Sequence, residues 1–250
     1  MSANTKIEWC NASWSPITGC SKISEACTHC YAERMSHRLS GRFGYPKTPN
    51  QFKLTFHANK LTQPVVWKKP KLIFVVSMGD VFHPDVKSRW LHDVWDIMGQ
   101  CPQHTFIILT KRPENAPRAD NWWFPNIWLG VTAENQKRAN ERIPILLQIP
   151  AKVRFVSVEP MLEEINLTNI SKPNQGAVKA HVLDRKGYYC GLDWVICGAE
   201  TGPGARYMDP AWACALHDQC RFADVPFFFK KASAGCALEL PREYPISFHQ

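Results

Sequence analysis

Six short apolar runs recur along this 250-residue chain, and each run ends in polar or small residues. The runs are Leu72–Met78, Thr105–Thr110, Ile127–Thr132, Val153–Val158, Asp193–Gly198 and Pro226–Lys230. Continuous apolar runs of this length are typical of strands buried on both faces, as in a parallel sheet covered by helices. The repetition predicts an α/β fold, a partial (βα)6 barrel of the TIM type, after an opening strand or loop near Trp14 to Thr18.

Helical signals and inserted loops complete the predicted architecture. Residues 86–100 place their apolar side chains on one helical face, and Asp209 followed by Pro210 is typical of a helix start. Two polar, turn-rich stretches, Gly41–Pro70 and Asn166–Gly191, interrupt the alternation. We interpret them as insertions in a single domain spanning residues 1–250.

Polar residues follow the predicted strands, at the edge where parallel α/β folds place their active sites. The candidates for binding a ligand there are Ser77, Met78, Gly79, Asp80, Lys111, Thr132, Glu134, Glu159, Glu200 and Lys230. Three carboxylates in equivalent positions indicate one shared pocket, in which Lys111, Arg112 and Lys230 would balance their charge. For any single glutamate, the alternative is a salt bridge or a helix cap.

A second group of polar residues follows the first long run. Asp80, His83 and Asp85 could form a metal triad. The favoured alternative is that they cap the helix predicted to begin near Val86 and add polarity to the pocket.

Three cysteines, Cys20, Cys27 and Cys30, lie close together near the start of the chain. Their spacing lets three thiolates converge from a loop and the helix that follows it. A structural zinc site uses four protein ligands, whereas a [4Fe–4S] cluster held by three cysteines leaves one iron open. The alternative is zinc, with His29, Cys10 or a distant residue as the fourth ligand.

Composition limits the setting of this site. The chain has ten cysteines and no apolar leader, which favours reduced thiols in the cytoplasm over a disulfide framework. No apolar run approaches the roughly 18 residues that span a bilayer, so we expect no membrane segment. The formal net charge of +8 permits DNA or RNA as a partner, although general solubility explains it equally well.

Several motifs resemble one known family. They are Lys6-Ile7-Glu8-Trp9, Trp14-Ser15-Pro16-Ile17-Thr18-Gly19-Cys20, Cys27-Thr28-His29-Cys30-Tyr31-Ala32, Leu109-Thr110-Lys111-Arg112-Pro113-Glu114, Leu129-Gly130-Val131-Thr132-Ala133-Glu134-Asn135 and Ser157-Val158-Glu159-Pro160-Met161. Together they resemble the phage Gp37/Gp68 family, whose members are similar to the radical S-adenosylmethionine (SAM) enzymes. One departure stands out, because six residues separate Cys20 from Cys27 where that superfamily usually has three.

The resemblance implies a barrel of the radical SAM type and two cofactors. A [4Fe–4S] cluster on Cys20, Cys27 and Cys30 would bind SAM at its fourth iron, and reductive cleavage would yield a 5′-deoxyadenosyl radical. His29 matches the position that packs beside the SAM adenine, and Ser77-Met78-Gly79-Asp80 matches the segment that binds the SAM amino group. A flavodoxin or ferredoxin would supply the electron.

Two functions therefore stay open from sequence. The first is a radical SAM enzyme that modifies or repairs nucleic acid or nucleotides. The second is a non-catalytic module that binds nucleic acid or protein and carries a structural zinc or iron–sulfur site.

Overall fold

The computed structural model describes residues 5, 7–171, 179–184 and 191–245. The chain forms two compact units, Met1–Trp128 and Leu129–Gln250. Each of the six predicted strands is present: β4 (Leu72–Val75), β5 (Thr105–Thr110), β6 (Ile127–Thr132), β7 (Val153–Val158), β10 (Trp194–Cys197) and β11 (Phe227–Phe229). The prediction of a mixed α/β fold with parallel strands is confirmed.

In the first unit, β1 (Ala12–Trp14), β4 and β5 are neighbours in a parallel sheet. Ala12 pairs with Ile73, and Ile73 pairs with Phe106. All four residues of β4 are buried, as their continuous apolar sequence predicts. The opening element predicted near Trp14 to Thr18 covers the end of β1, which pairs with β4, and the two residues of β2 (Ile17–Thr18).

The cysteine motif follows β2 (Ile17–Thr18), whose partner is β3 (Thr55–Phe56) in an antiparallel pair. Strand β3 lies inside the predicted insertion Gly41–Pro70, together with the helix α2 (Ala58–Leu61) and the 3₁₀ helix η2 (Gln63–Val66). This insertion is therefore not wholly irregular. It places its strand against β2, immediately before Cys20.

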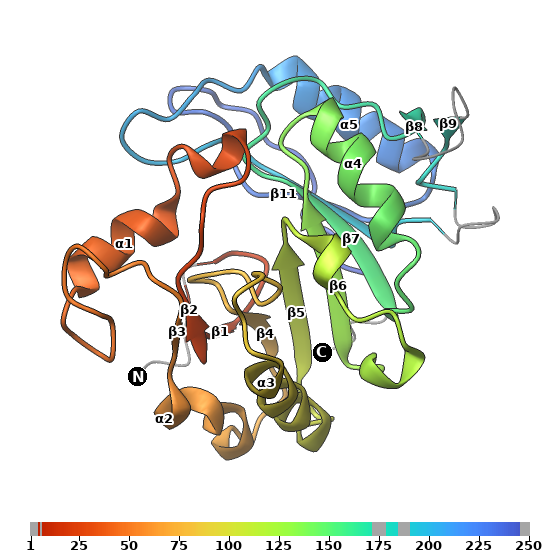
Figure 1. Ribbon diagram of the computed structural model, residues 1–250. Helices are drawn as coiled ribbons and strands as arrows, with labels where there is room; N and C mark the ends of the chain where they lie inside the picture. Colours follow the sequence, from red (N-terminus) through yellow and green to blue (C-terminus); the bar gives the residue numbers. More distant parts are fainter. Residues whose placement is uncertain (1–4, 6, 172–178, 185–190, 246–250) are drawn as a thin grey trace. The chain divides into compact units, whose positions relative to one another are not determined.

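The helices of the first unit lie around this sheet, as Figure 1 shows. Besides α2 and η2, they are η1 (Glu25–Cys27), α1 (Tyr31–Leu39), α3 (Ser88–Gln100), η3 (Pro113–Asn115) and η4 (Asp120–Trp122). The predicted helix 86–100 is α3, which begins two residues later than expected. It buries the apolar face that the sequence predicts, and both α2 and η2 contact it.

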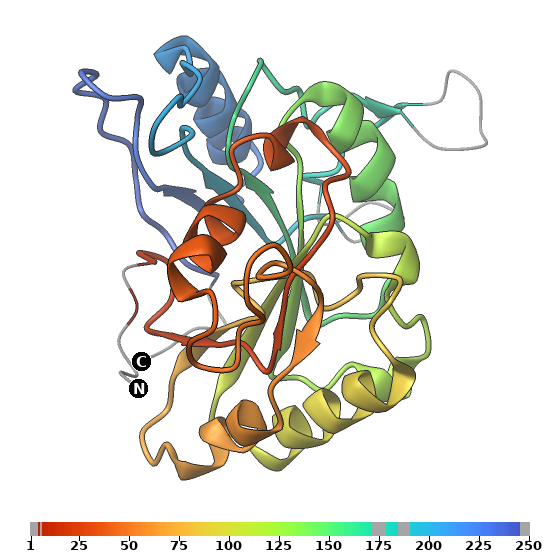
Figure 2. The same cartoon turned by 60° about the vertical axis from the view of Figure 1, so that its left-hand side comes forward.

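In the second unit, β6, β7, β10 and β11 follow one another as neighbours. Helix α4 (Gln136–Leu146) begins after Asn135, whose side chain accepts a hydrogen bond from the Arg138 amide. Helix α5 (Pro210–Phe222), drawn in blue in Figure 2, contacts β11. At the start of α5, Asp209 accepts a hydrogen bond from the Ala211 amide. The predicted start at Asp209 and Pro210 is confirmed.

The second predicted insertion, Asn166–Gly191, is described only in part. It contains β8 (Ile170–Ser171) and β9 (Lys179–Ala180), which pair antiparallel, and β8 contacts α4. Residues 172–178 and 185–190 lie outside the described residues. Across the described part of the chain, no helix has the length and apolar character to cross a bilayer.

Candidate functional site

Two glycines fix the position of Cys20. The Gly19 amide donates to the Met78 carbonyl at 2.9 Å, and Gly19 forms an isolated parallel bridge with Gly79. A Cβ on Gly79 would lie 2.7 Å from the Gly19 oxygen, and Gly19 has a φ of +93°. A side chain on Gly79 would push the two segments apart, whereas one on Gly19 would collide with the Lys53 carbonyl. The contact between the two glycines holds Cys20 beside the residues that follow β4.

The three cysteines lie on one stretch of loop and helix, as predicted. Cys20 follows β2, Cys27 is the last residue of η1, and Cys30 is the N-cap residue of α1. All three are partly exposed and none forms a disulfide. Among the described residues, however, no three His, Cys, Asp or Glu side chains stand close enough to hold a metal ion.

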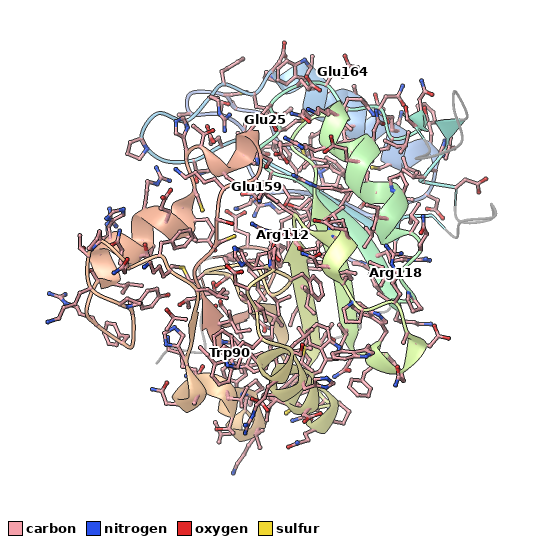
Figure 3. The ribbon with its side chains drawn as sticks, viewed as in Figure 1. Glu25, Trp90, Arg112, Arg118, Glu159 and Glu164 are labelled. Carbon is pink, nitrogen blue, oxygen red and sulfur yellow. The ribbon has the colours of Figure 1, made fainter. Side chains whose placement is uncertain are left out.

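Arg112 links Cys20 to the end of β5 (Figure 3). Its Nη1 donates to Cys20 Sγ and to Asp80 Oδ2, each at 3.3 Å. Its Nη2 donates to the Ser21 carbonyl at 2.9 Å and to Ser21 Oγ at 3.0 Å. Because Arg112 is only 3% exposed, its planar guanidinium is held in one orientation against the cysteine loop.

The Asp80 carboxylate holds Arg112 in position. Asp80 Oδ1 accepts from the Phe82 amide and the Thr110 hydroxyl, and Oδ2 accepts from the Lys111 amide. The carboxylate is buried, so these hydrogen bonds and the arginine compensate for its lost hydration. Both oxygens of Asp80 are therefore engaged within the first unit.

The capping role predicted for Asp80, His83 and Asp85 is wrong. The N-cap residue of α3 is Lys87, and no side chain caps that helix. The reason is that the Asp80 side chain turns back to Phe82 and Thr110.

His83 supports the cysteine loop through Ser21. Its Nδ1 accepts from the Asp85 amide at 3.2 Å, and its Nε2 lies 2.8 Å from Ser21 Oγ. Burial lowers the pKa of His83, and the nearby Arg112 lowers it further. In the neutral ring Nδ1 is then the acceptor, so Nε2 carries the proton that it donates to Ser21.

The pKa values of Cys20 and Cys27 are shifted in opposite directions. Burial raises the pKa of Cys20, Asp80 adds to that rise, and Arg112 opposes it. Burial alone would also raise the pKa of Cys27, but Lys111 and hydrogen bonds from the Ile23 and Ser24 region lower it overall. Cys27 is therefore the more readily ionised thiol of this pair.

Other predicted ligand-binding residues of the first unit surround the same loop. Ser77 Oγ lies 2.6 Å from Ser13 Oγ, and the Ser77 carbonyl accepts from the Tyr31 hydroxyl. Met78 contributes the carbonyl that binds Gly19. His29 is partly exposed and directly precedes Cys30. Structure thus brings His29, Ser77, Met78, Gly79 and Lys111 into one region with the cysteines.

The remaining candidates belong to the second unit. Glu134 is fully buried after β6, and its Oε2 accepts from Arg142 Nη1 at 2.8 Å. The same Nη1 donates to the Thr132 carbonyl at 2.7 Å. This is the salt bridge that sequence reasoning left open as the alternative for a single glutamate.

Two further carboxylates also pair with cations of the second unit. Glu159, after β7, forms an ion pair with Lys230, after β11. A Cβ on Gly198 would lie 3.3 Å from Lys230 Cβ and 3.6 Å from Glu159 Cδ, so Gly198 lies directly beside the pair. Glu200 accepts from Arg206 Nε at 2.8 Å. Lys230 was expected to balance the charge of the carboxylates, and the carboxylate that it pairs with is Glu159.

Sequence reasoning did not find the contacts from Arg112 and His83 to the cysteine loop. The Lys-Arg pair after a predicted strand was visible, and a cation there was expected to balance carboxylates. Its second partner, a sulfur 92 residues earlier in the chain, depends on how the loop returns over the sheet. No local pattern encodes that return.

Comparison with known proteins gives one match. A family model described as "Protein of unknown function (DUF5131)" matches residues 4–240. Searches of curated proteins and of solved structures found no match.

Proposed function

The chain belongs to the DUF5131 family, and we propose that it is a radical SAM-type enzyme. In this proposal Cys20, Cys27 and Cys30 hold a [4Fe–4S] cluster, and SAM binds at the fourth iron. The observation that carries it is a loop with three partly exposed thiols, of which the first accepts a hydrogen bond from a buried arginine. The proposal includes a partial (βα)6 barrel of the radical SAM type.

The chemistry of the donor set suits such a cluster. Three thiols in one short segment agree with a site that leaves one iron open. A cluster with three thiolates is anionic, and Arg112 and Lys111 supply positive charge beside Cys20 and Cys27. The sulfurs are not gathered in a coordinating arrangement among the described residues, so binding would draw η1 and the start of α1 together.

When bound and reduced, the cluster would supply one electron that cleaves SAM to methionine and a 5′-deoxyadenosyl radical. The electron comes from an external one-electron donor such as a flavodoxin or ferredoxin, in the reducing cytoplasm. The residues of the chain would bind the cluster and SAM and orient them. Arg112 holds Cys20 through the hydrogen bond from Nη1 to Sγ. Asp80 holds Arg112 through Oδ2, and the Asp80 carboxylate is itself fixed because Oδ2 also accepts from the Lys111 amide.

SAM binding is assigned to the partly exposed residues around the loop. His29 would pack beside the adenine, while Ser77, Met78 and Gly79 line the segment next to Cys20. The candidates of the second unit, Glu159, Glu200 and Lys230, are partly exposed and stay proposals for SAM or substrate contact. Glu134 and Thr132 are buried, and Arg142 already contacts both.

Anaerobic reconstitution tests this function. The protein is incubated with iron, sulfide and a strong reductant, then with SAM, and iron, sulfide and 5′-deoxyadenosine are measured. We expect about four iron and four sulfide per chain. The triple variant Cys20→Ala, Cys27→Ala, Cys30→Ala should lose all three signals, whereas Cys214→Ala, Cys236→Ala should keep them, since those partly exposed cysteines lie outside the loop.

The second candidate function is a binding module with a structural zinc ion. It is supported by the close pair Cys27 and Cys30 with His29 between them, since zinc sites commonly include such a pair of cysteines. It predicts one zinc per chain, no sulfide and no 5′-deoxyadenosine. Iron and sulfide without any 5′-deoxyadenosine would indicate a structural cluster and would refute the enzymatic proposal.

A further inference from the structure

The helix that follows Cys30 and the loop after it carry a concentration of positive charge. Residues 31–54 contain five Lys or Arg residues and a single acidic residue, Glu33. Glu33 is already paired, because Lys22 Nζ lies 2.9 Å from its Oε2. The exposed members, Arg38, Arg42, Phe43, Lys47 and Lys53, are called the basic surface below. None of its four cations forms an ion pair within the described residues.

An aromatic ring stands among these cations. Phe43 is 64% exposed, which is unusual for phenylalanine. Its φ is +51°, in the left-handed region that a non-glycine residue adopts only when its surroundings impose it. The loop closes around it, since the Gly41 amide donates to the Pro46 carbonyl at 3.3 Å and the Tyr45 amide donates to the Arg42 carbonyl at 2.9 Å. The backbone thus presents the ring outward.

Two of the cations, Arg42 and Lys47, lie in the same loop as that ring. Arg42 is its immediate neighbour. Lys47 folds back onto Gly41, two residues before Phe43, because a Cβ built on Gly41 would lie 3.3 Å from Lys47 Cγ. Thr48 secures this return, since its amide donates to Ser40 Oγ at 2.8 Å. Arg42 and Lys47 therefore both belong to the short loop that carries Phe43.

The basic surface leads directly to the cysteine loop. The Cys20 amide donates to the Phe52 carbonyl at 3.3 Å. A Cβ on Gly19 would collide with the Lys53 carbonyl, so the backbones of the two segments touch. In Figure 1 the loop runs from the end of α1 and returns towards β3. A ligand lying along the basic surface would have one end beside Cys20.

We propose that the basic surface binds single-stranded nucleic acid, with Phe43 stacked on a base and its cations on phosphates. Unpaired cations suit a phosphodiester backbone, and an outward aromatic ring suits an unstacked base. A duplex hides the faces of its bases, so the exposed ring favours a single strand. This inference deepens the proposed function by naming its substrate class, and it rests on that function only for the reaction.

Fluorescence anisotropy with labelled single-stranded DNA and RNA of the same length tests the proposal, with duplex DNA as a further arm. Phe43→Ala should weaken binding on the order of 10-fold, and Phe43→Trp should restore it, because any aromatic ring stacks on a base. The slope of log affinity against log salt is negative. Arg42→Gln with Lys47→Gln should reduce its magnitude by about 1.4, which corresponds to the loss of two phosphate contacts.

The matched control is Lys68→Gln with Lys69→Gln, which removes the same charge from exposed residues of the same unit. It should leave affinity and salt slope close to those of the original protein. Equal losses in the control and in the Arg42 and Lys47 variant would overturn the proposal, as would tighter binding to duplex. Competition by polyglutamate as strong as that by an oligonucleotide of equal charge would point to an acidic protein partner and overturn it too.

The cysteine variant separates this inference from the proposed function. The triple variant at Cys20, Cys27 and Cys30 should still bind the oligonucleotide. Binding without any 5′-deoxyadenosine from the reconstituted protein would refute the enzymatic proposal alone. SAM cleavage without oligonucleotide binding at low salt would refute the basic surface alone.

Discussion

Replacement of Arg112 by methionine removes the cation whose Nη1 lies 3.3 Å from Asp80 Oδ2. Asp80 is 5% exposed and Arg112 is 3% exposed, so the remaining carboxylate would be buried without its counter-charge. Breaking one side of a buried pair costs about 3–5 kcal/mol. Asp80 keeps its hydrogen bonds from Thr110, Lys111 and Phe82, which places the expected loss near the lower limit, at about 3 kcal/mol.

Urea unfolding followed by tryptophan fluorescence measures this loss. A double-mutant cycle with Asp80→Asn isolates the interaction, and we expect a coupling free energy of about 1–2 kcal/mol. Arg89→Met is the matched control, because Arg89 is exposed on α3 and its loss should change stability by less than about 0.5 kcal/mol. A loss below about 1 kcal/mol for Arg112→Met, or an additive cycle, would show that the contact is not structural.

Two other buried groups give measurable effects. His57 is 4% exposed, and burial together with nearby Lys60 lowers its pKa from 6.5 to about 4, so it contributes about 3 kcal/mol of stability that is present above pH 6.5 and lost as the pH falls towards 4. His57→Gln should flatten urea stability over that range, and an unchanged pH profile would contradict the assignment. Glu134→Gln should cost about 3–5 kcal/mol in urea unfolding because Arg142 stays buried. If this variant instead keeps full stability and only SAM binding falls, Glu134 acts on the ligand.

The strands and the cysteine loop were predictable because each depends on local sequence. Apolar runs such as Leu72–Met78 are long enough for one buried strand, and Cys30 does lie at the start of a helix. Asp209 and Pro210 encode a helix start within two residues, and the structure has it there. Each of these features needs no knowledge of distant contacts.

The partners of charged residues were less predictable, since they depend on tertiary contacts. Glu134 and Arg142 are eight residues apart, and only the turn between β6 and α4 brings them together. Arg112 and Cys20 are separated by 92 residues. The predicted cap on α3 failed for the same reason, because Asp80 found partners on β5 and the residues after it.

The backbone contact between Gly19 and Gly79 has a consequence for mutagenesis. Neither residue carries a reactive group, yet an added methyl on Gly79 would collide with the Gly19 oxygen, and one on Gly19 would collide with the Lys53 carbonyl. Either collision would move Cys20 away from Arg112. A saturation screen for activity would therefore mark both positions as indispensable. That result would show that neither position has space for one additional carbon atom. It would not show which groups perform the chemistry.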